Sequence, residues 1–166
     1  KTGSNVFKVY KDGEIVYDKV LNSGAVGDRN IDENTIFAIH SMTKTVTTVA
    51  AMILHEKGMF KLDDPLHKYL PEFKDVKCKG SEGIYDCENE IKVVDILTHR
   101  SGYIYYLDNG DNWLTGTHNS LYPSYINTSR FNNLDDFSKA VAKHPLEFEP
   151  GSMYAYGLNQ AILGRL

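Results

Sequence analysis

The hydrophobic pattern of this chain changes its period once, near Ser41, and that change limits the folds that the chain can adopt. Before Ser41, "NVFKVYKDGEIVYDKV" alternates apolar and polar residues on both sides of "KDG", which is the pattern of two strands joined by a tight turn. After Ser41, apolar residues recur at helical spacing as far as Gly58. The sequence therefore predicts a β-hairpin with strands near 5–11 and 14–21, followed by a helix.

The rest of the chain favours short helices. Prolines enclose one or two helical turns in "LDDPLHKYLPEF", and "EIKVVDILTHRSGY" predicts a short helix that stops near Gly102. A further helix is expected in "LDDFSKAVAKH", capped by Asp135 or Asp136, and "YGLNQAILGRL" begins a last one that the chain end cuts off. Strands followed by helices indicate the α+β class.

Composition and charge exclude several classes of protein. The chain has 166 residues, 42% of them hydrophobic, and 18 basic against 22 acidic side chains give 18 − 22 = −4, without long runs of one sign. We therefore expect no nucleic-acid partner. The longest nearly apolar stretch, 46–54, is far shorter than the roughly 20 residues of a membrane span. We expect one partial domain over 1–166, with the hairpin and a strand in 1–38 and a mostly helical part in 39–166.

Two cysteines and one sequon indicate where the protein works. Cys78 and Cys87 flank the glycine-containing segment "KGSEGIYD", so we predict a disulfide that closes this loop; the alternative is two unrelated surface thiols. Asn127 opens the glycosylation triplet "NTS". No signal peptide opens the chain, so we expect one to be absent or already removed. The cysteine pair and the glycosylation triplet both indicate a secreted or extracytoplasmic protein.

Ser41 and Lys44 lie three residues apart where the helix is expected to begin. One interpretation makes Ser41 the helix N-cap, because serine is a preferred cap. In the other, Ser41 is a nucleophile whose proton passes to Lys44, which lies on the same helix face one turn away. Because Ser-x-x-Lys is common by chance, further motifs are needed to decide between the two interpretations.

Three further segments accompany "FAIHSMTKT" in a fixed order: "GMFKLDDPLHKYLPEF", "IKVVDILTHRSG" and "EPGSMYAYG". Together they resemble the serine β-lactamase and penicillin-binding-protein superfamily, most closely its class C β-lactamases and family VIII carboxylesterases. This resemblance covers the chain from the hairpin to its last residue. It implies a β-lactamase/transpeptidase-like fold, an antiparallel sheet with helices, of which this chain is the N-terminal portion.

The resemblance also assigns roles to individual residues. It implies that Ser41 is the acyl-enzyme nucleophile, that Lys44 is its base or proton relay, and that Tyr156 shares proton transfer with the lysine. Tyr154 is the alternative to Tyr156 if the register differs by two. By the same resemblance, His99 in "LTHRSG" is structural and holds a loop near the site.

The chain departs from the family pattern in two places. Leu158, which is predicted to bind substrate, stands where β-lactamases of this branch usually carry an asparagine, and this resembles the esterase branch. Asn159 could substitute only if the helix start shifted. The family's later edge strand, bearing Lys/His-Thr/Ser-Gly, does not follow the tyrosine motif. The "KTG" at 1–3 is interpreted as a coincidence, and the alternative is a rearranged or permuted chain. We therefore expect a second polypeptide or a C-terminal remainder to supply that strand and complete the oxyanion hole. The apolar end of the last helix, 161–163, also points to a partner surface.

The long segment 103–133 is rich in Tyr, Asn, Gly and Ser and has no clear period, so we expect it to be functional or mobile. Its aromatic residues either line an acyl pocket or pack the loop onto the domain, and the ones predicted to bind substrate are Tyr105, Tyr106 and Trp113. The six histidines lack the spacing of a metal site, and phosphate-binding and dinucleotide motifs are absent. We expect no metal and no cofactor.

The sequence thus predicts a serine hydrolase or acyltransferase that forms an ester at Ser41. Small esters are the expected substrates, with amides and β-lactams less favoured. The alternative is a non-catalytic binding or structural protein on the same scaffold, because a fold does not fix a function.

Overall fold

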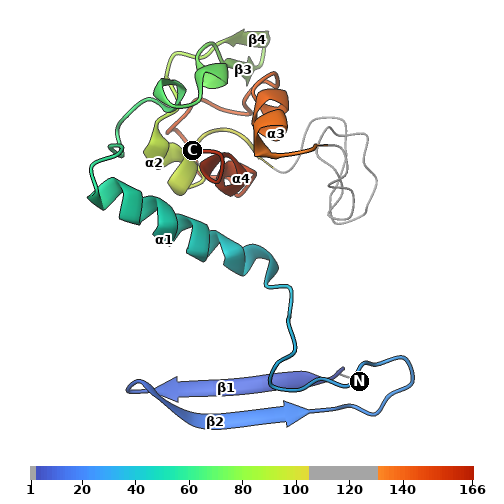
Figure 1. The fold of residues 1–166 in the computed structure, drawn as a ribbon. Coiled ribbons are helices and arrows are strands. Elements are labelled where there is room, and N and C mark those ends of the chain that lie inside the picture. Colours follow the sequence, from blue (N-terminus) through green and yellow to red (C-terminus); the bar gives the residue numbers. More distant parts are fainter. Residues whose placement is uncertain (1–2, 105–130) are drawn as a thin grey trace. The chain divides into compact units, whose positions relative to one another are not determined.

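The computed structural model describes residues 3–104 and 131–166 of the chain (Figure 1). The chain divides into two compact units, residues 1–40 and residues 41–166.

The first unit is built on a β-hairpin. Strand β1 (Asn5–Lys11) pairs antiparallel with β2 (Glu14–Leu21). Asp12 and Gly13 join the strands with φ angles of 52° and 85°, and positive φ at both central residues is what a tight hairpin turn requires. The structure confirms both predicted strands with the predicted bounds.

The strand expected just before Ser41 is not formed. Residues 35–39 are irregular, and in the part of the chain that the structure describes the two sheets are β1–β2 and β3–β4. An apolar segment becomes a strand only where a neighbouring strand accepts and donates its backbone hydrogen bonds. Here Asp28 instead folds the connection back on the hairpin, because its carboxylate accepts hydrogen bonds from the backbone and the hydroxyl of Ser4 (2.8 and 2.7 Å).

Helix α1 (Thr43–Glu56) follows a short 3₁₀ turn, η1 (His40–Met42). Its N-cap is Met42, and no side chain caps the helix. Ser41 therefore lies one residue before the cap, so the cap interpretation of Ser41 is wrong. The helix stops two residues before Gly58, whose φ of 72° is the left-handed conformation that commonly ends helices.

The second unit has a hydrophobic core between its helices. Helices α2 (Val93–Leu97) and α1 both pack on α4 (Asn159–Leu163). The 3₁₀ turn η2 (Leu66–Lys68) lies between Pro65 and Pro71 and confirms the helical turn expected there, and a second 3₁₀ turn, η3 (Pro71–Phe73), begins at Pro71 itself. The fully buried aliphatic residues of the core are Leu66, Leu70, Ile91, Val93, Ile96, Leu146 and Ile162.

The apolar residues of α4 do not form the exposed surface that the sequence indicated. Ile162 and Leu163 are 0% and 4% exposed and belong to the core of the second unit. They are covered because α4 packs against α1, α2 and α3 (Leu134–Val141). Their burial removes one argument for a partner surface at this helix.

Helix α3 is capped by a different residue from the two predicted. The side chain of Asn133 accepts the backbone N–H of Asp136 at 2.8 Å. A cap residue must lie outside the helix and bond the N–H two or three positions later. Asp135 and Asp136 already lie inside the first turn of α3, so the prediction that one of them caps the helix is wrong.

The cysteine loop is a second hairpin, which the sequence pattern did not show. Strands β3 (Lys77–Gly80) and β4 (Gly83–Asp86) pair antiparallel. A disulfide joins Cys78 to Cys87, as predicted. The hairpin is anchored to the second unit because the backbone N–H of Lys79 donates to the carbonyl oxygen of Leu146 at 2.8 Å.

Among residues 3–104 and 131–166, the helices fall short of the length and apolar character that crossing a bilayer demands.

Candidate active site

Ser41 and Lys44 are in contact at the start of α1. The Nζ atom of Lys44 lies 3.2 Å from the Oγ atom of Ser41, within hydrogen-bond distance. The 3₁₀ turn and the first turn of α1 place residues 41 and 44 on one face of the helix. Ser41 is exposed and Lys44 is partly buried, so the hydroxyl is open to an incoming molecule while the amine lies behind it.

Tyr156 reaches the same oxygen atom from a distant part of the chain. Its hydroxyl donates a hydrogen bond to Ser41 Oγ at 3.0 Å. Lys44 Nζ also lies 5.0 Å from the centre of the Tyr156 ring, a distance at which a cation and an aromatic ring attract each other. The side chain that meets Ser41 is therefore Tyr156 and not Tyr154, whose ring packs edge-on against His99.

The neighbours of Tyr156 make it a better proton donor than a free tyrosine. Partial burial raises the pKa of its hydroxyl, but hydrogen bonds with Lys44 and Ser41 and the positive charge of Lys44 outweigh this, so the pKa lies below its usual value. A phenol whose pKa is lowered toward neutrality transfers protons more readily at physiological pH.

The backbone around Tyr156 is fixed by residues that follow α2. The N–H of Ala155 donates to the carbonyl oxygen of His99 at 2.9 Å, and the N–H of Gly151 donates to that of Arg100 at 2.8 Å. Gly157 passes so close to the chain that an added Cβ would lie 2.1 Å from the carbonyl oxygen of Tyr103. Only glycine fits this position without a shift of the backbone.

A buried polar network supports the same turn. Asn159 is fully buried; its Oδ1 atom accepts the hydroxyl of Ser101, and its Nδ2 atom lies 3.3 Å from the carbonyl oxygen of Tyr103. The same Nδ2 atom lies 3.1 Å from His99 Nδ1, which also accepts the N–H of Gly157 at 3.2 Å. Sequence reasoning missed Ser101 and Gly157 as parts of the site. The available signals were the "HRSG" motif for Ser101 and the "YAYG" motif for Gly157, but the residues that these two contact are determined by the fold.

Comparison with known proteins identifies the family of this chain. A family profile described as Beta-lactamase matches residues 3–166. The chain belongs to the beta-lactamase family. Within this family it is similar to esterase EstB of Burkholderia gladioli, with 31% identity over 157 residues that make up 94% of this chain and 38% of that esterase.

The chain is also similar to two further proteins, one compared by sequence and one by fold. A putative D-alanyl-D-alanine carboxypeptidase of Salmonella typhimurium is 29% identical over 138 residues, covering 79% of this chain and 27% of that protein. The solved structure of EstCE1, a hydrolase with promiscuous acyltransferase activity, superimposes with a TM-score of 0.71 at 24% identity, covering 96% of this chain and 40% of that one. The chain thus spans well under half the length of these relatives and has the N-terminal portion of the β-lactamase-like fold.

The structure locates only part of the predicted substrate-binding set. Leu158 is 8% exposed and packs in the core at the start of α4, and its contact with substrate stays a prediction. Tyr105, Tyr106 and Trp113 lie outside the described residues, as does the predicted glycosylation site Asn127.

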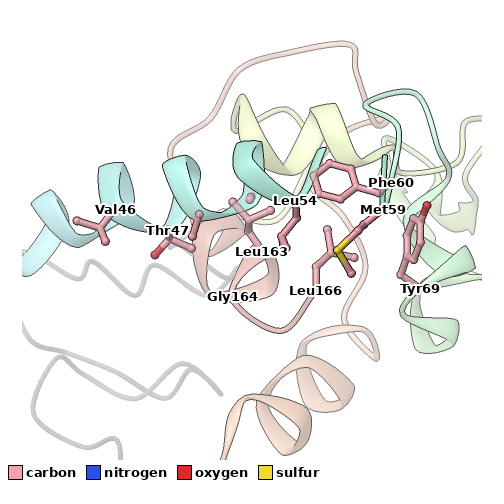
Figure 2. Close-up of a pocket in the computed structure, with 11 residues that line it drawn as sticks. Val46, Thr47, Leu54, Met59, Phe60, Tyr69, Leu163, Gly164 and Leu166 are labelled. Atoms are coloured by element: carbon pink, nitrogen blue, oxygen red, sulfur yellow. The ribbon is translucent and has the colours of Figure 1, made fainter. Parts of the chain in front are cut away.

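A separate apolar pocket lies along α1 (Figure 2). It has a volume of about 500 Å³. Leu54, Phe60 and Leu163 are among its lining residues, and Ser41, Lys44 and Tyr156 are not. The pocket is therefore distinct from the place where Ser41, Lys44 and Tyr156 meet.

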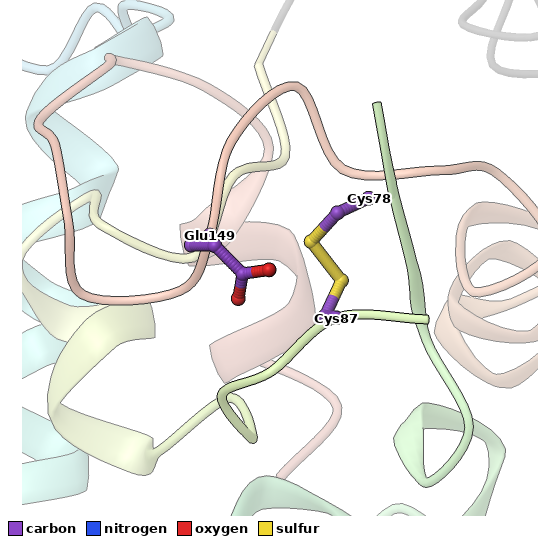
Figure 3. Close-up of side chains that lie close together, drawn as sticks. All are labelled: Cys78, Cys87 and Glu149. Atoms are coloured by element: carbon purple, nitrogen blue, oxygen red, sulfur yellow. A yellow bond between two sulfur atoms is a disulfide. The ribbon is translucent and has the colours of Figure 1, made fainter. Parts of the chain in front are cut away.

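One cluster has the composition of a metal site but not the chemistry. Cys78, Cys87 and Glu149 have their ligand atoms within 4.8 Å of one another (Figure 3). The two sulfur atoms are bonded to each other, so they cannot serve as thiolate ligands. The carboxylate of Glu149 is occupied as well, because it accepts the backbone N–H groups of Glu88 and Asn89 at 3.0 to 3.1 Å.

Proposed function

We propose that the protein is a serine hydrolase that forms an acyl ester at Ser41. The observation that carries the proposal is the convergence of two proton-transfer groups on one hydroxyl: Lys44 Nζ lies 3.2 Å and the Tyr156 hydroxyl 3.0 Å from Ser41 Oγ. A serine hydroxyl needs a neighbouring base to become a nucleophile. Membership of the beta-lactamase family and the similarity to an esterase support the same proposal.

The proposed reaction uses these groups in two steps. Ser41 Oγ attacks the carbonyl carbon of the ester as its proton passes to the Lys44–Tyr156 pair, giving a tetrahedral intermediate. The bond from that carbon to the alcohol oxygen then breaks, and the leaving oxygen takes the proton from the pair. Water then attacks the carbonyl carbon of the acyl-Ser41 ester as one of its protons passes to the Lys44–Tyr156 pair. The bond from that carbon to Ser41 Oγ breaks, Oγ takes the proton back from the pair, and the acid is released. If an alcohol takes the place of this water, the same site transfers the acyl group instead.

We propose small esters as substrates, ahead of amides and β-lactams. An ester's alcohol is a better leaving group than an amine and needs less assistance from the site. Leu158 carries no amide that could bind the side chain of a lactam, and the Asn159 amide is committed to Ser101, His99 and Tyr103. The similarity to esterase EstB agrees with this choice.

We further propose that a segment outside this chain completes the oxyanion hole, either as a C-terminal remainder or as a second polypeptide. The chain covers 38% of the length of esterase EstB. The backbone N–H of Ser41 would be one donor to the oxyanion, and a second donor must come from a neighbouring element. An extracytoplasmic location is proposed as well, since disulfides such as Cys78–Cys87 persist in oxidising compartments.

The test compares Ser41→Ala with Thr45→Ala in the intact protein. Thr45 is exposed on the same helix and serves as the matched control. Hydrolysis of a p-nitrophenyl ester of a short acid is measured by release of the phenolate. We expect the Ser41→Ala protein to lose turnover while the Thr45→Ala protein keeps it. Equal turnover by the wild type and Ser41→Ala would refute the proposal, and a folded wild type without turnover would favour the non-catalytic binding protein.

A further inference from the structure

His99 contacts the tyrosine segment in more ways than a loop anchor requires. Its carbonyl oxygen accepts the N–H of Ala155, its Nδ1 atom accepts the N–H of Gly157, and its ring packs against the ring of Tyr156 at 4.7 Å between centres. The residue before Tyr156, the residue after it and the tyrosine ring itself are therefore all held by one side chain and its backbone.

The polarity of these contacts fixes the protonation state of the imidazole. The N–H of Gly157 can only donate, so the Nδ1 atom 3.2 Å away must accept with its lone pair. The Asn159 amide agrees: its Oδ1 atom accepts the Ser101 hydroxyl, so its Nδ2 atom faces both Tyr103 O and His99 Nδ1 as a donor. His99 is thus neutral, with its proton on Nε2.

The backbone of His99 is also specialised for this position. Its φ angle is 56°, in the left-handed region that residues other than glycine and asparagine adopt at a cost. Local strain of this kind persists when surrounding contacts hold it in place. The left-handed turn directs the carbonyl oxygen and the ring of His99 toward the same segment.

We propose that His99 is a positioning residue that holds the Tyr156 hydroxyl against Ser41, by accepting the Gly157 and Asn159 N–H groups at Nδ1 and by packing its ring on the tyrosine. The proposal rests on the proposed function, because it assumes that Tyr156 moves a proton. It differs from a purely structural role in that it ties the geometry of proton transfer to an unprotonated Nδ1.

Protonation of His99 would break this arrangement. A proton on Nδ1 would point at the N–H groups of Gly157 and Asn159, so both contacts would become repulsive. The charged and titratable groups that face the ring are Lys44 from α1 and Tyr154 and Tyr156 from the tyrosine segment. Partial burial, and then the positive charge of Lys44, lower the pKa of His99 below its usual value of 6.5. The neutral form therefore persists to lower pH than in a free histidine.

Two substitutions at His99 distinguish the effect of its hydrogen-bond acceptor, Nδ1, from the effect of its ring. His99→Asn places an amide oxygen where Nδ1 lies, tolerates the positive φ and does not titrate. His99→Phe keeps a ring of similar size but removes the acceptor. We expect kcat for ester hydrolysis by the intact protein to fall about 10²-fold in His99→Phe, as for a misplaced catalytic group. The His99→Asn variant should keep most of the wild-type kcat.

The pH profile gives a readout that a merely structural residue would not change. The wild type should lose kcat as the pH falls through the pKa of His99, and His99→Asn should lack this acid limb. His144→Asn is the control, since the pKa of His144 is also lowered by burial but its side chain lies outside the site. Equal losses in His99→Asn and His99→Phe, or a limb with a midpoint below 6.5 that survives in His99→Asn, would overturn the proposal.

Nitrogen NMR of the His99 imidazole in the wild type tests the proposal without a substitution. Its result therefore does not depend on whether the variants fold. The proposal requires the Nε2–H tautomer with an unprotonated Nδ1 at neutral pH, and an Nδ1–H tautomer would contradict it. The Ser41→Ala variant tests the proposed function separately from the positioning role of His99. If that variant still hydrolyses esters, the proposed function fails. If Ser41→Ala is inactive while His99→Phe matches the wild type in kcat, the positioning role alone fails.

Discussion

At the scale of single residues, the candidate site depends on Tyr156, whose side chain contacts Ser41 at the start of α1. Tyr156 and Lys44 both lie within hydrogen-bond distance of Ser41 Oγ. Because the lysine also faces the tyrosine ring, a proton taken from Ser41 has two adjoining acceptors. This arrangement gives the pair the means to accept a proton in one step and return it in the next.

The role of the tyrosine hydroxyl leads to a prediction about pH. Tyr156→Phe removes the hydroxyl and should lower kcat for ester hydrolysis about 10²-fold or more, as expected for the loss of general acid–base catalysis. In the wild type, turnover should rise with pH along a limb whose midpoint lies below 10.0, because the pKa of Tyr156 is lowered from that value. The pH profile of Tyr156→Phe should lack this limb, and an unchanged profile would exclude Tyr156 from proton transfer. Tyr154→Phe is the matched control.

Gly157 gives a second prediction at this scale. A Cβ at this position would lie 2.1 Å from Tyr103 O and 2.7 Å from Ile104 Cα, so Gly157→Ala should lower the free energy of unfolding by about 1–3 kcal/mol or more. At Gly164 an added Cβ would meet only the end of the Leu134 side chain, at 3.4 Å, apart from backbone oxygens of its own helix. Gly164→Ala should therefore leave that free energy unchanged or raise it by about 0.5–1 kcal/mol. Denaturant unfolding of both variants measures the difference, and equal effects would contradict the close approach at Gly157.

At the scale of elements, the sequence predicted what local chemistry determines. The "KDG" turn fixes β1 and β2, and the apolar spacing after Ser41 predicts α1. The β3–β4 hairpin was missed because its four-residue strands have no alternating pattern of their own and are held by the disulfide and by Leu146. Motif order similarly indicated the residues that meet at Ser41. The hydrogen bonds that hold Tyr156 could not be predicted, because they join residues 50 or more positions apart.

The disulfide should contribute measurably to the stability of the second unit. It joins residues nine positions apart, and closing a loop of this size in the unfolded chain stabilises a protein by about 3 kcal/mol. Reducing the bond, or replacing both Cys78 and Cys87 with alanine, should lower the denaturant midpoint of the second unit. Comparison of oxidised and reduced protein in urea measures the effect, and coincident unfolding curves would show that the bond contributes nothing.

At the scale of the whole molecule, the two units differ in how they bury their side chains. The hairpin of residues 1–40 leaves Phe7, Val9 and Ile15 about half exposed, whereas Ile96 and Ile162 of the second unit are fully buried. A two-stranded hairpin alone is only marginally stable in water. The second unit therefore holds the core of the described chain, and Ser41, Lys44 and Tyr156 belong to it.

This difference predicts unequal protection from hydrogen exchange. In the chain of residues 1–166 by itself, the amides of β1 and β2 should exchange faster than those of α2 and α4, because less apolar surface holds the hairpin closed. Exchange measured by mass spectrometry of peptides from each unit provides the comparison. Equal protection of the hairpin and the helices would show that the two units open together.

The most direct test of the central claim is intact-mass spectrometry of the protein before and after exposure to a fluorophosphonate. Attack by an activated serine oxygen on phosphorus expels fluoride and leaves one phosphonyl group on the protein. We expect a single adduct that maps to Ser41 and is absent from the Ser41→Ala variant. A folded wild type that gains no adduct, or gains it on another residue, would contradict the assignment of Ser41 as an activated nucleophile.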